Sequence, residues 1–208
     1  MIALIDYGMG NLRSVHKALE YVGGRVTLTD APADVTRADG VILPGVGNFG
    51  DGMEHLRSRG LADAVVRAIA AGKPFLGICL GMQMLLDSSE EAPGVAGLGV
   101  FRGRVVRFPE GREKVPHMGW NSITVKQSCR CLEQVADGTF FYFVHSFYAA
   151  PEDPSVVAAS CSYMVDFAAA LGRDNIFATQ FHPEKSQNGG LAILRSFVGS
   201  VGDAAPKQ

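Results

Sequence analysis

The amino-acid sequence predicts an α/β fold, with an open, mostly parallel β-sheet, helices on both faces and an antiparallel extension. Two observations support this prediction. In the N-terminal half, short apolar runs alternate with stretches of helical periodicity, as they do where helices connect parallel strands. After about residue 98, six β-rich runs follow one another with short connections, which favours antiparallel pairing.

Apolar spacing places the elements of the N-terminal half. Asn11 can cap a helix in which Leu12, Val15 and Leu19 recur at helical spacing, and Gly72 before Pro74 ends another helix. The expected strands are residues 2–6, 25–29, 41–43 and 75–78. The expected helices cover residues from Leu12, around Met53–Arg57, from Leu61 to Ala71, and from Cys79 onward.

The C-terminal half is expected to extend the sheet and to close with a helix. The β-rich runs are residues 100–108, 121–125, 141–144, 156–160, 167–171 and 176–179, and the closing helix is expected from about Gly189 to Val201. We see no linker or repeat, and therefore expect a single domain over residues 1–201. The small and polar residues 202–208 are expected to form a disordered tail.

Composition excludes several classes of function. The 208 residues are 47% hydrophobic, which is enough for one well-buried domain. The net charge is −2 without a basic run, so nucleic acid is not an expected partner. No apolar stretch reaches the roughly 18 residues of a membrane span, and the four cysteines have neither metal-site spacing nor disulfide density. We expect a cytoplasmic protein without a metal or cofactor.

Cys79 has the sequence context of a catalytic nucleophile. It lies in Gly77–Gly81, directly after an apolar run, in the pattern Gly-x-nucleophile-x-Gly of a sharp turn between strand and helix. Small residues are needed on both sides because this turn brings neighbouring backbone segments close together. A thiol at a helix N-terminus is also favoured as the thiolate, the form that attacks carbonyl carbon.

His182 and Glu184 form the matching acid–base pair. They lie in Phe181-His182-Pro183-Glu184, at the end of the last β-rich run, and in an extended segment residues i and i+2 face the same side. A carboxylate beside an imidazole fixes its tautomer and stabilises the imidazolium formed during proton transfer. Cys79 and His182 are far apart in sequence, so only the fold can bring them together.

Acyl chemistry at Cys79 requires backbone N–H donors for an oxyanion. The Leu80 amide is the natural first donor. The second is expected from the glycine-rich loop after the strand at residues 41–43, where either Val46 or Gly47 can supply it. An ordinary βα turn or a phosphate loop is the alternative interpretation of these glycines.

Other polar groups are expected near the nucleophile. Gln83 lies one helical turn after Cys79 and can hold a polar substrate group. The aromatic run ending at Ser146 and Phe147 can place backbone groups against a substrate. His145 is a rival base, but it has no carboxylate two residues further on.

These motifs resemble the class I (triad) glutamine amidotransferases, which have a flavodoxin-like sheet, and among them the glutaminase subunits of imidazole glycerol phosphate synthases. The segments that carry the resemblance run in order along nearly the whole chain: residues 5–12, 43–47, 77–83, 89–94, 116–121, 143–146 and 181–186. The Cys and His-Pro-Glu motifs identify the superfamily. Pro116–Asn121 and the pair Met82-Gln83 narrow the resemblance to this subunit.

The resemblance implies that L-glutamine is hydrolysed to glutamate and ammonia through a thioester on Cys79, with His182 as acid–base and Glu184 as its orienter. It also implies a heterodimer in which ammonia passes to a (β/α)₈-barrel cyclase subunit. That subunit makes imidazole glycerol phosphate and an aminoimidazole carboxamide ribotide in histidine biosynthesis. By resemblance the glutamine is held by Gln83, Glu91, Ser146 and Phe147, and the cyclase faces Asn11, Met118, Trp120 and Lys185.

Three alternatives remain at this stage. The chain can serve another synthase as its glutaminase, act as a free-standing cysteine hydrolase of γ-glutamyl compounds, or be an inactive regulatory subunit, although intact Cys79, His182 and Glu184 argue against the last. Phe147 stands where relatives often have Tyr, so no hydroxyl role is expected there. We also hypothesise that the loop at residues 44–48 rests in an unproductive orientation in the free subunit.

Overall fold

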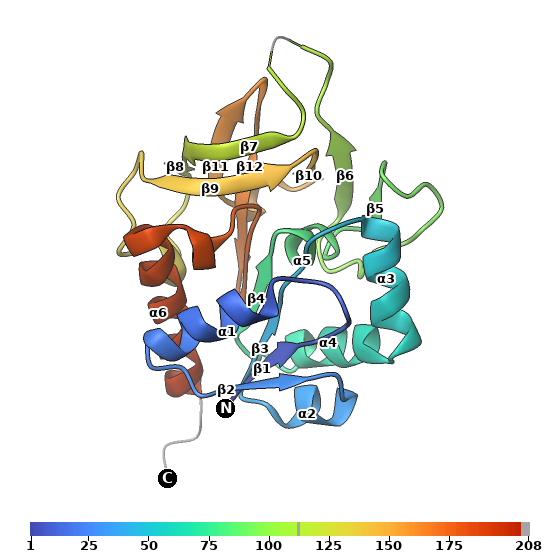
Figure 1. Ribbon diagram of the computed structural model, residues 1–208, viewed down its shortest axis with the longest axis vertical. Coiled ribbons are helices and arrows are strands. Elements are labelled where there is room, and N and C mark those ends of the chain that lie inside the picture. Colours follow the sequence, from blue (N-terminus) through green and yellow to red (C-terminus); the bar gives the residue numbers. More distant parts are fainter. Residues whose placement is uncertain (112, 205–208) are drawn as a thin grey trace.

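An eight-stranded sheet with the strand order β2-β1-β3-β4-β13-β12-β11-β8 forms the centre of the protein. It is seen in a computed structural model that describes residues 1–111 and 113–204. The first five strands in this order pair in parallel, and the last three are antiparallel to their neighbours (Figure 1). The predicted α/β class with an antiparallel extension is therefore confirmed.

Most of the parallel strands are buried along their whole length. The parallel strands are β1 (Ile2–Ile5), β2 (Val26–Thr29), β3 (Gly40–Leu43), β4 (Phe75–Ile78) and β13 (Ile176–Thr179). The antiparallel strands are β8 (Thr124–Val125), β11 (Val157–Tyr163) and β12 (Val165–Arg173). Every residue of β1, β3, β4 and β13 is buried, as expected where helices cover both faces of a sheet.

Helices cover the two faces of the sheet and form two separate hydrophobic clusters. On one face, Val15 and Leu19 of α1 (Leu12–Tyr21) share a cluster with Phe197 and Val201 of α6 (Gln187–Ala204). The other face is covered by α2 (Pro32–Arg37), α3 (Phe49–Ser58) and α4 (Leu61–Ala70). Figure 1 shows these two groups of helices on opposite sides of the sheet.

Two small sheets lie beside the main one, which differs from the prediction that every C-terminal β-run extends it. One contains β5 (Ser88–Ser89), β6 (Gly103–Arg107) and β10 (Phe147–Pro151), and the other pairs β7 (His117–Ser122) with β9 (Phe140–His145). Alternate residues of β9 are buried, so it has one covered face, unlike the central strands. Figure 1 shows β7 and β9 crossing beyond the end of the main sheet where β4 meets α5 (Leu80–Gln83).

Several element boundaries also differ from prediction. α2 and β10 were not predicted, and α2 has only six residues, too few to show helical periodicity. Asn11 is the N-cap residue of α1, but its side chain makes no capping hydrogen bond. α6 continues to Ala204, three residues into the predicted tail; residues 205–208 lie outside the described part. Three short 3₁₀ helices are η1 (Arg130–Leu132), η2 (Pro154–Val156) and η3 (Pro183–Lys185).

The described helices include none that is long and apolar enough to cross a membrane.

Gly81 is expected to tolerate no side chain, because the turn after β4 presses it against β3. A Cβ on Gly81 would lie 1.9 Å from the Leu43 carbonyl oxygen, which belongs to a buried strand and cannot move aside. We expect Gly81→Ala to lower the free energy of unfolding by about 3 kcal/mol, measured by urea denaturation. Gly202→Ala is the control, since a Cβ there meets no atom within 4 Å. Equal stability of the two variants would contradict this account.

Candidate active site

The pairing of β4 with β13 brings Cys79 and His182 to one edge of the sheet. Ile78 is in register with Thr179, so the segments that follow these two residues leave the sheet side by side. The Cys79 N–H donates to the Thr179 carbonyl oxygen over 2.7 Å and continues the ladder by one bond. One strand pair thus brings the Cys79 and His182 motifs together although they are far apart in the sequence.

Cys79 adopts the sharp turn that its sequence context predicts. Its backbone has φ 53° and ψ −107°, a conformation that is costly for a residue with a side chain. A Cβ on Gly77 would lie 3.1 Å from the Gly81 backbone, so the turn needs both glycines. The following helix α5 is only four residues long, which limits the dipole contribution that we expected to favour the thiolate.

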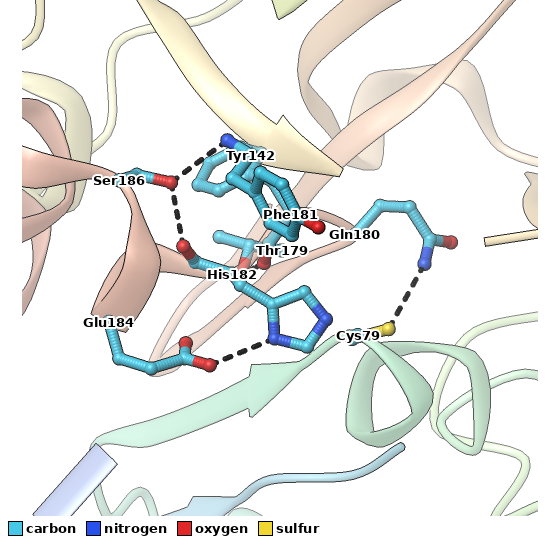
Figure 2. Close-up of polar contacts among 8 residues, drawn as sticks. All are labelled: Cys79, Tyr142, Thr179, Gln180, Phe181, His182, Glu184 and Ser186. Carbon is cyan, nitrogen blue, oxygen red and sulfur yellow. Dashed lines mark hydrogen bonds and ion pairs between the residues drawn. The ribbon is translucent and has the colours of Figure 1, made fainter. Parts of the chain in front are cut away.

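His182 and Glu184 form a buried hydrogen-bonded pair. His182 Nδ1 lies 2.9 Å from Glu184 Oε1, and the two side chains are 2% and 1% exposed. The segment is the 3₁₀ helix η3 rather than the extended strand end that we expected, so a tight turn brings them together. Figure 2 shows the imidazole ring between the Glu184 carboxylate and the Cys79 sulfur.

The electrostatics of the site favour a charged His182. Burial acts to lower its pKa, but the negative charge of Cys79, together with the hydrogen bond to Glu184 and its charge, outweighs burial and raises the pKa well above its usual value. His182 Nε2 is buried and has no partner of good hydrogen-bond geometry among the described residues. The ring therefore presents a proton on the thiol side while the carboxylate stabilises its charge.

The backbone of His182 is held by hydrogen bonds to Ser186 and Tyr142 that the sequence did not indicate. The hydroxyl of Ser186, which is 1% exposed, donates to the His182 carbonyl oxygen over 2.6 Å and accepts from the Tyr142 N–H over 3.0 Å. The His182 N–H donates to the Tyr142 carbonyl oxygen. Figure 2 shows Ser186 joining β9 to the segment that holds the histidine.

The first expected oxyanion donor is engaged within the protein in this structure. The Leu80 N–H donates to the Gly45 carbonyl oxygen over 3.4 Å, so the first donor is already engaged by the glycine-rich loop. Tyr7 is fully buried, and its hydroxyl donates to the Pro44 carbonyl oxygen over 2.9 Å, a bond that stabilises the start of the loop. Gly47 has φ +101°, which a residue with a side chain rarely adopts.

A pocket of about 300 Å³ opens at the thiol. Cys79 and every residue that we expected to contribute to the oxyanion hole or to hold substrate line it: Leu80, Val46, Gly47, Gln83, Glu91, Ser146 and Phe147. Pro116, Val144 and His145 complete its wall. The structure thus brings together seven expected residues from four separate segments of the chain.

Several of these lining residues also have partners within the protein. Glu91 Oε2 accepts from the Phe49 N–H at the start of α3 over 2.8 Å. The Ser146 carbonyl oxygen accepts from the Phe108 N–H. The Phe147 carbonyl oxygen accepts from both Gln83 Nε2, over 2.9 Å, and His145 Nδ1, over 2.8 Å. These carbonyl groups therefore stabilise the pocket wall.

Gln180 is a site residue that the sequence analysis missed. It is fully buried in the segment between β13 and His182, and its Nε2 lies 3.7 Å from the Cys79 sulfur (Figure 2). Gln83 Nε2 donates to Gln180 Oε1 over 3.0 Å. Its place two residues before His182 is a sequence signal that could have pointed to it.

The rival base, His145, is not placed to act on Cys79. Its two ring nitrogens face the Phe147 carbonyl oxygen and His117 Nδ1, the latter over 3.0 Å. Burial lowers the pKa of His145 to about 3, with further lowering by His117 and His182 against the bond to Phe147. Burial also lowers the pKa of His117 to about 4. Both rings are neutral in the neutral range and serve as internal hydrogen-bonding groups.

The four residues expected to face a partner lie around β7, η3 and the start of α1. Met118 and Trp120 are 63% and 45% exposed on the outer face of β7. Lys185 is exposed with its Nζ 5.5 Å from the centre of the Tyr142 ring, which also meets Trp120 edge to face. Asn11 is half-buried, and η3 lies against both α1 and β9. These residues form a partly aromatic surface beside the catalytic segment.

Comparison with known proteins agrees with this geometry. The family model "Glutamine amidotransferase class-I" matches residues 3–200. The imidazole glycerol phosphate synthase subunit HisH of Geobacter sulfurreducens is 53% identical over 202 residues, covering 94% of this chain and 97% of that protein. The same-named subunit of Geobacillus thermodenitrificans is 52% identical over 97% of this chain and 96% of that protein.

A solved structure supports the fold independently. A crystal structure of a glutamine amidotransferase superposes with a TM-score of 0.76 over 97% of this chain and 100% of that one, at 20% identity. At this identity the likeness speaks for the architecture alone. With the full-length family match and the relatives above half identity, the chain belongs to the class I glutamine amidotransferase family, among the HisH subunits of imidazole glycerol phosphate synthase.

Proposed function

We propose that this glutamine amidotransferase hydrolyses L-glutamine through a cysteinyl thioester and passes the ammonia to a (β/α)₈-barrel cyclase subunit. That partner would make imidazole glycerol phosphate and an aminoimidazole carboxamide ribotide in histidine biosynthesis, in the cytoplasm. The observation that carries the proposal is the arrangement of Cys79, His182 and Glu184 beside a pocket lined by Gln83 and Glu91. No cofactor is needed for this chemistry.

Each triad residue has one role in the proposed reaction. The Cys79 thiolate attacks the carboxamide carbon of the substrate, the C–N bond breaks, and His182 gives its proton to the departing ammonia. The thioester then reacts with water, which passes a proton back to His182, and the Cys79 thiolate leaves as glutamate is released. Glu184 keeps the ring oriented and stabilises its charge in both steps.

The conformation of the glycine-rich loop at residues 44–48 supports a glutaminase whose activity depends on partner binding. Both steps pass through an oxyanion that needs N–H donors, but the Leu80 amide is engaged by the Gly45 carbonyl oxygen. We propose that the free subunit turns over slowly for this reason, and that partner binding shifts the population toward a loop with Leu80 and either Val46 or Gly47 as donors. The positive φ of Gly47 makes such reorientation feasible.

The two alternative functions predict a different activating partner or a different state of the loop. A glutaminase of another synthase would be stimulated by that other synthase. A free-standing hydrolase of γ-glutamyl compounds would need a loop that is productive without a partner, and the engaged Leu80 amide favours the partner-dependent enzyme over it.

Replacing the nucleophile should separate the two halves of the reaction. We expect Cys79→Ala to abolish glutamate release, because none of the other described residues lining the pocket carries a thiol, while the complex with the cyclase still makes product from added ammonium salt. Glutamate release and ammonia-dependent synthesis are measured on the same preparation. Loss of both activities in a correctly folded complex would contradict the proposed division of labour.

The histidine and the carboxylate should contribute unequally. We expect His182→Ala to lower kcat by about 10²- to 10⁴-fold, the usual contribution of general acid–base catalysis. Glu184→Gln should cost less, since it keeps a hydrogen-bonding group beside Nδ1 and removes only the charge. Steady-state glutamate release by the complex measures both. Equal losses would show that the carboxylate does more than orient the ring.

Partner binding should switch the glutaminase on. We expect glutamate release by the purified chain to be low and to rise at least tenfold when the barrel cyclase and its nucleotide ligand are added, because the Leu80 amide and a second loop amide then become available as donors. An unrelated barrel protein added at the same concentration is the control. High activity of the chain alone, unchanged by the cyclase, would favour the free-standing hydrolase.

A further inference from the structure

We propose that Gln180 is a catalytic residue whose side-chain amide donates a hydrogen bond to the sulfur of Cys79. This proposal rests on the proposed function, in which Cys79 is the nucleophile. Gln180 Nε2 lies 3.7 Å from the sulfur, within the range for a sulfur acceptor. The side chain is fully buried, so water does not compete for this contact.

The backbone fixes where the Gln180 side chain begins. Its N–H donates to the Ala169 carbonyl oxygen of the neighbouring strand β12 over 2.9 Å. The two residues on either side point elsewhere: Thr179 donates its hydroxyl to the Phe181 carbonyl oxygen, and Phe181 stacks on Phe141. Gln180 is thus held between β13 and the catalytic histidine with only its amide facing the thiol.

The direction of the amide follows from a backbone carbonyl. The Phe147 oxygen can only accept, so the atom of Gln83 that faces it must be the nitrogen. That nitrogen also faces Gln180, so the facing atom of Gln180 must be its oxygen. The nitrogen of Gln180 is left on the side of the Cys79 sulfur, and an N–H group points at it.

A second series of hydrogen bonds, from Asn121 through His117 and His145, also ends at the Phe147 carbonyl oxygen, and there too the carbonyl accepts. The Ser122 N–H donates to Asn121 Oδ1, so Asn121 Nδ2 faces His117 Nε2 at 3.3 Å and must donate to it. His117 Nδ1 then donates to His145 Nε2, and His145 Nδ1 donates to Phe147. Every bond in this series has one allowed direction when both rings are neutral.

The amide has a chemical task at two points of the proposed reaction. In the resting site, an N–H donor stabilises negative charge on a sulfur that is largely shielded from water. In thioester hydrolysis, the sulfur leaves with its bonding electron pair and the same donor stabilises the charge that returns to it. His182 supplies the proton, and Gln180 supplies a fixed dipole that needs no proton transfer.

The test measures how the reactivity of Cys79 depends on pH. Iodoacetamide is neutral and reacts with the thiolate, which displaces iodide, so the midpoint of its rate–pH profile reports thiolate formation. We expect Gln180→Leu to move this midpoint upward by about one pH unit, the size expected when a charged group loses one donor. Gln127→Leu is the matched control, because Gln127 donates to the Gly172 carbonyl oxygen outside the pocket and contacts no triad residue in any described hydrogen bond.

A second variant guards against loss of folding. Gln180→Glu keeps the shape and the acceptor for Gln83 but replaces the donor by a carboxylate oxygen, so it should raise the midpoint at least as far as Gln180→Leu. Thermal unfolding shows whether each variant is folded. A folded variant of either kind with an unchanged midpoint would overturn the role of Gln180, even if kcat fell.

Failure of this proposal is distinguishable from failure of the proposed function. The wild-type chain treated with iodoacetamide is digested, and the labelled cysteine is identified by mass spectrometry, with Cys79→Ala assayed beside it. Label on Cys79 and an inactive Cys79→Ala variant, together with an unmoved Gln180 profile, would overturn only the role of Gln180. Full glutaminase activity of Cys79→Ala would overturn both.

Discussion

The parallel pairing of β4 with β13 is the contact on which the site depends. It joins segments about one hundred residues apart and places the thiol, the buried amide and the imidazole at a single edge of the sheet. Because both strands are buried on both faces, they have little freedom to shift in register. The strained turn at Cys79 is held by this rigid frame, which offsets its backbone cost.

Ionisable groups are concentrated in the site. A carboxylate, an imidazolium and a thiolate in a row leave one negative charge in excess, and burial of such groups is tolerated only when donors surround them. Among the described residues, the Gln180 amide is the donor to the sulfur and His182 is the partner of Glu184 Oε1, while Glu184 Oε2 is buried without a hydrogen-bond partner. Fixed dipoles of this kind need no rearrangement during the reaction, which is how most enzymes stabilise changing charge.

Local pattern was enough for much of this structure, and tertiary contacts decided the rest. The buried strands and the Gly-x-Cys-x-Gly turn were predictable because their signals lie within a few residues. Gln180, Ser186 and Tyr7 were not, since a buried polar side chain acquires meaning only from partners that the fold brings near. The state of Leu80 depends on the orientation of one peptide group, which no residue type encodes. The pairing of β7 with β9 apart from the main sheet likewise depends on contacts between distant segments, which local pattern does not show.

The Phe147 carbonyl oxygen has a consequence for protons. Hydrogen bonds reach it from His145 on one side and from Gln83 on the other, and both are donors. A carbonyl oxygen that accepts two hydrogen bonds has no proton to donate. The neutral histidines therefore do not form a proton-transfer path through it to Gln83. The described hydrogen bonds of the His182 ring run to Glu184 and not to these histidines.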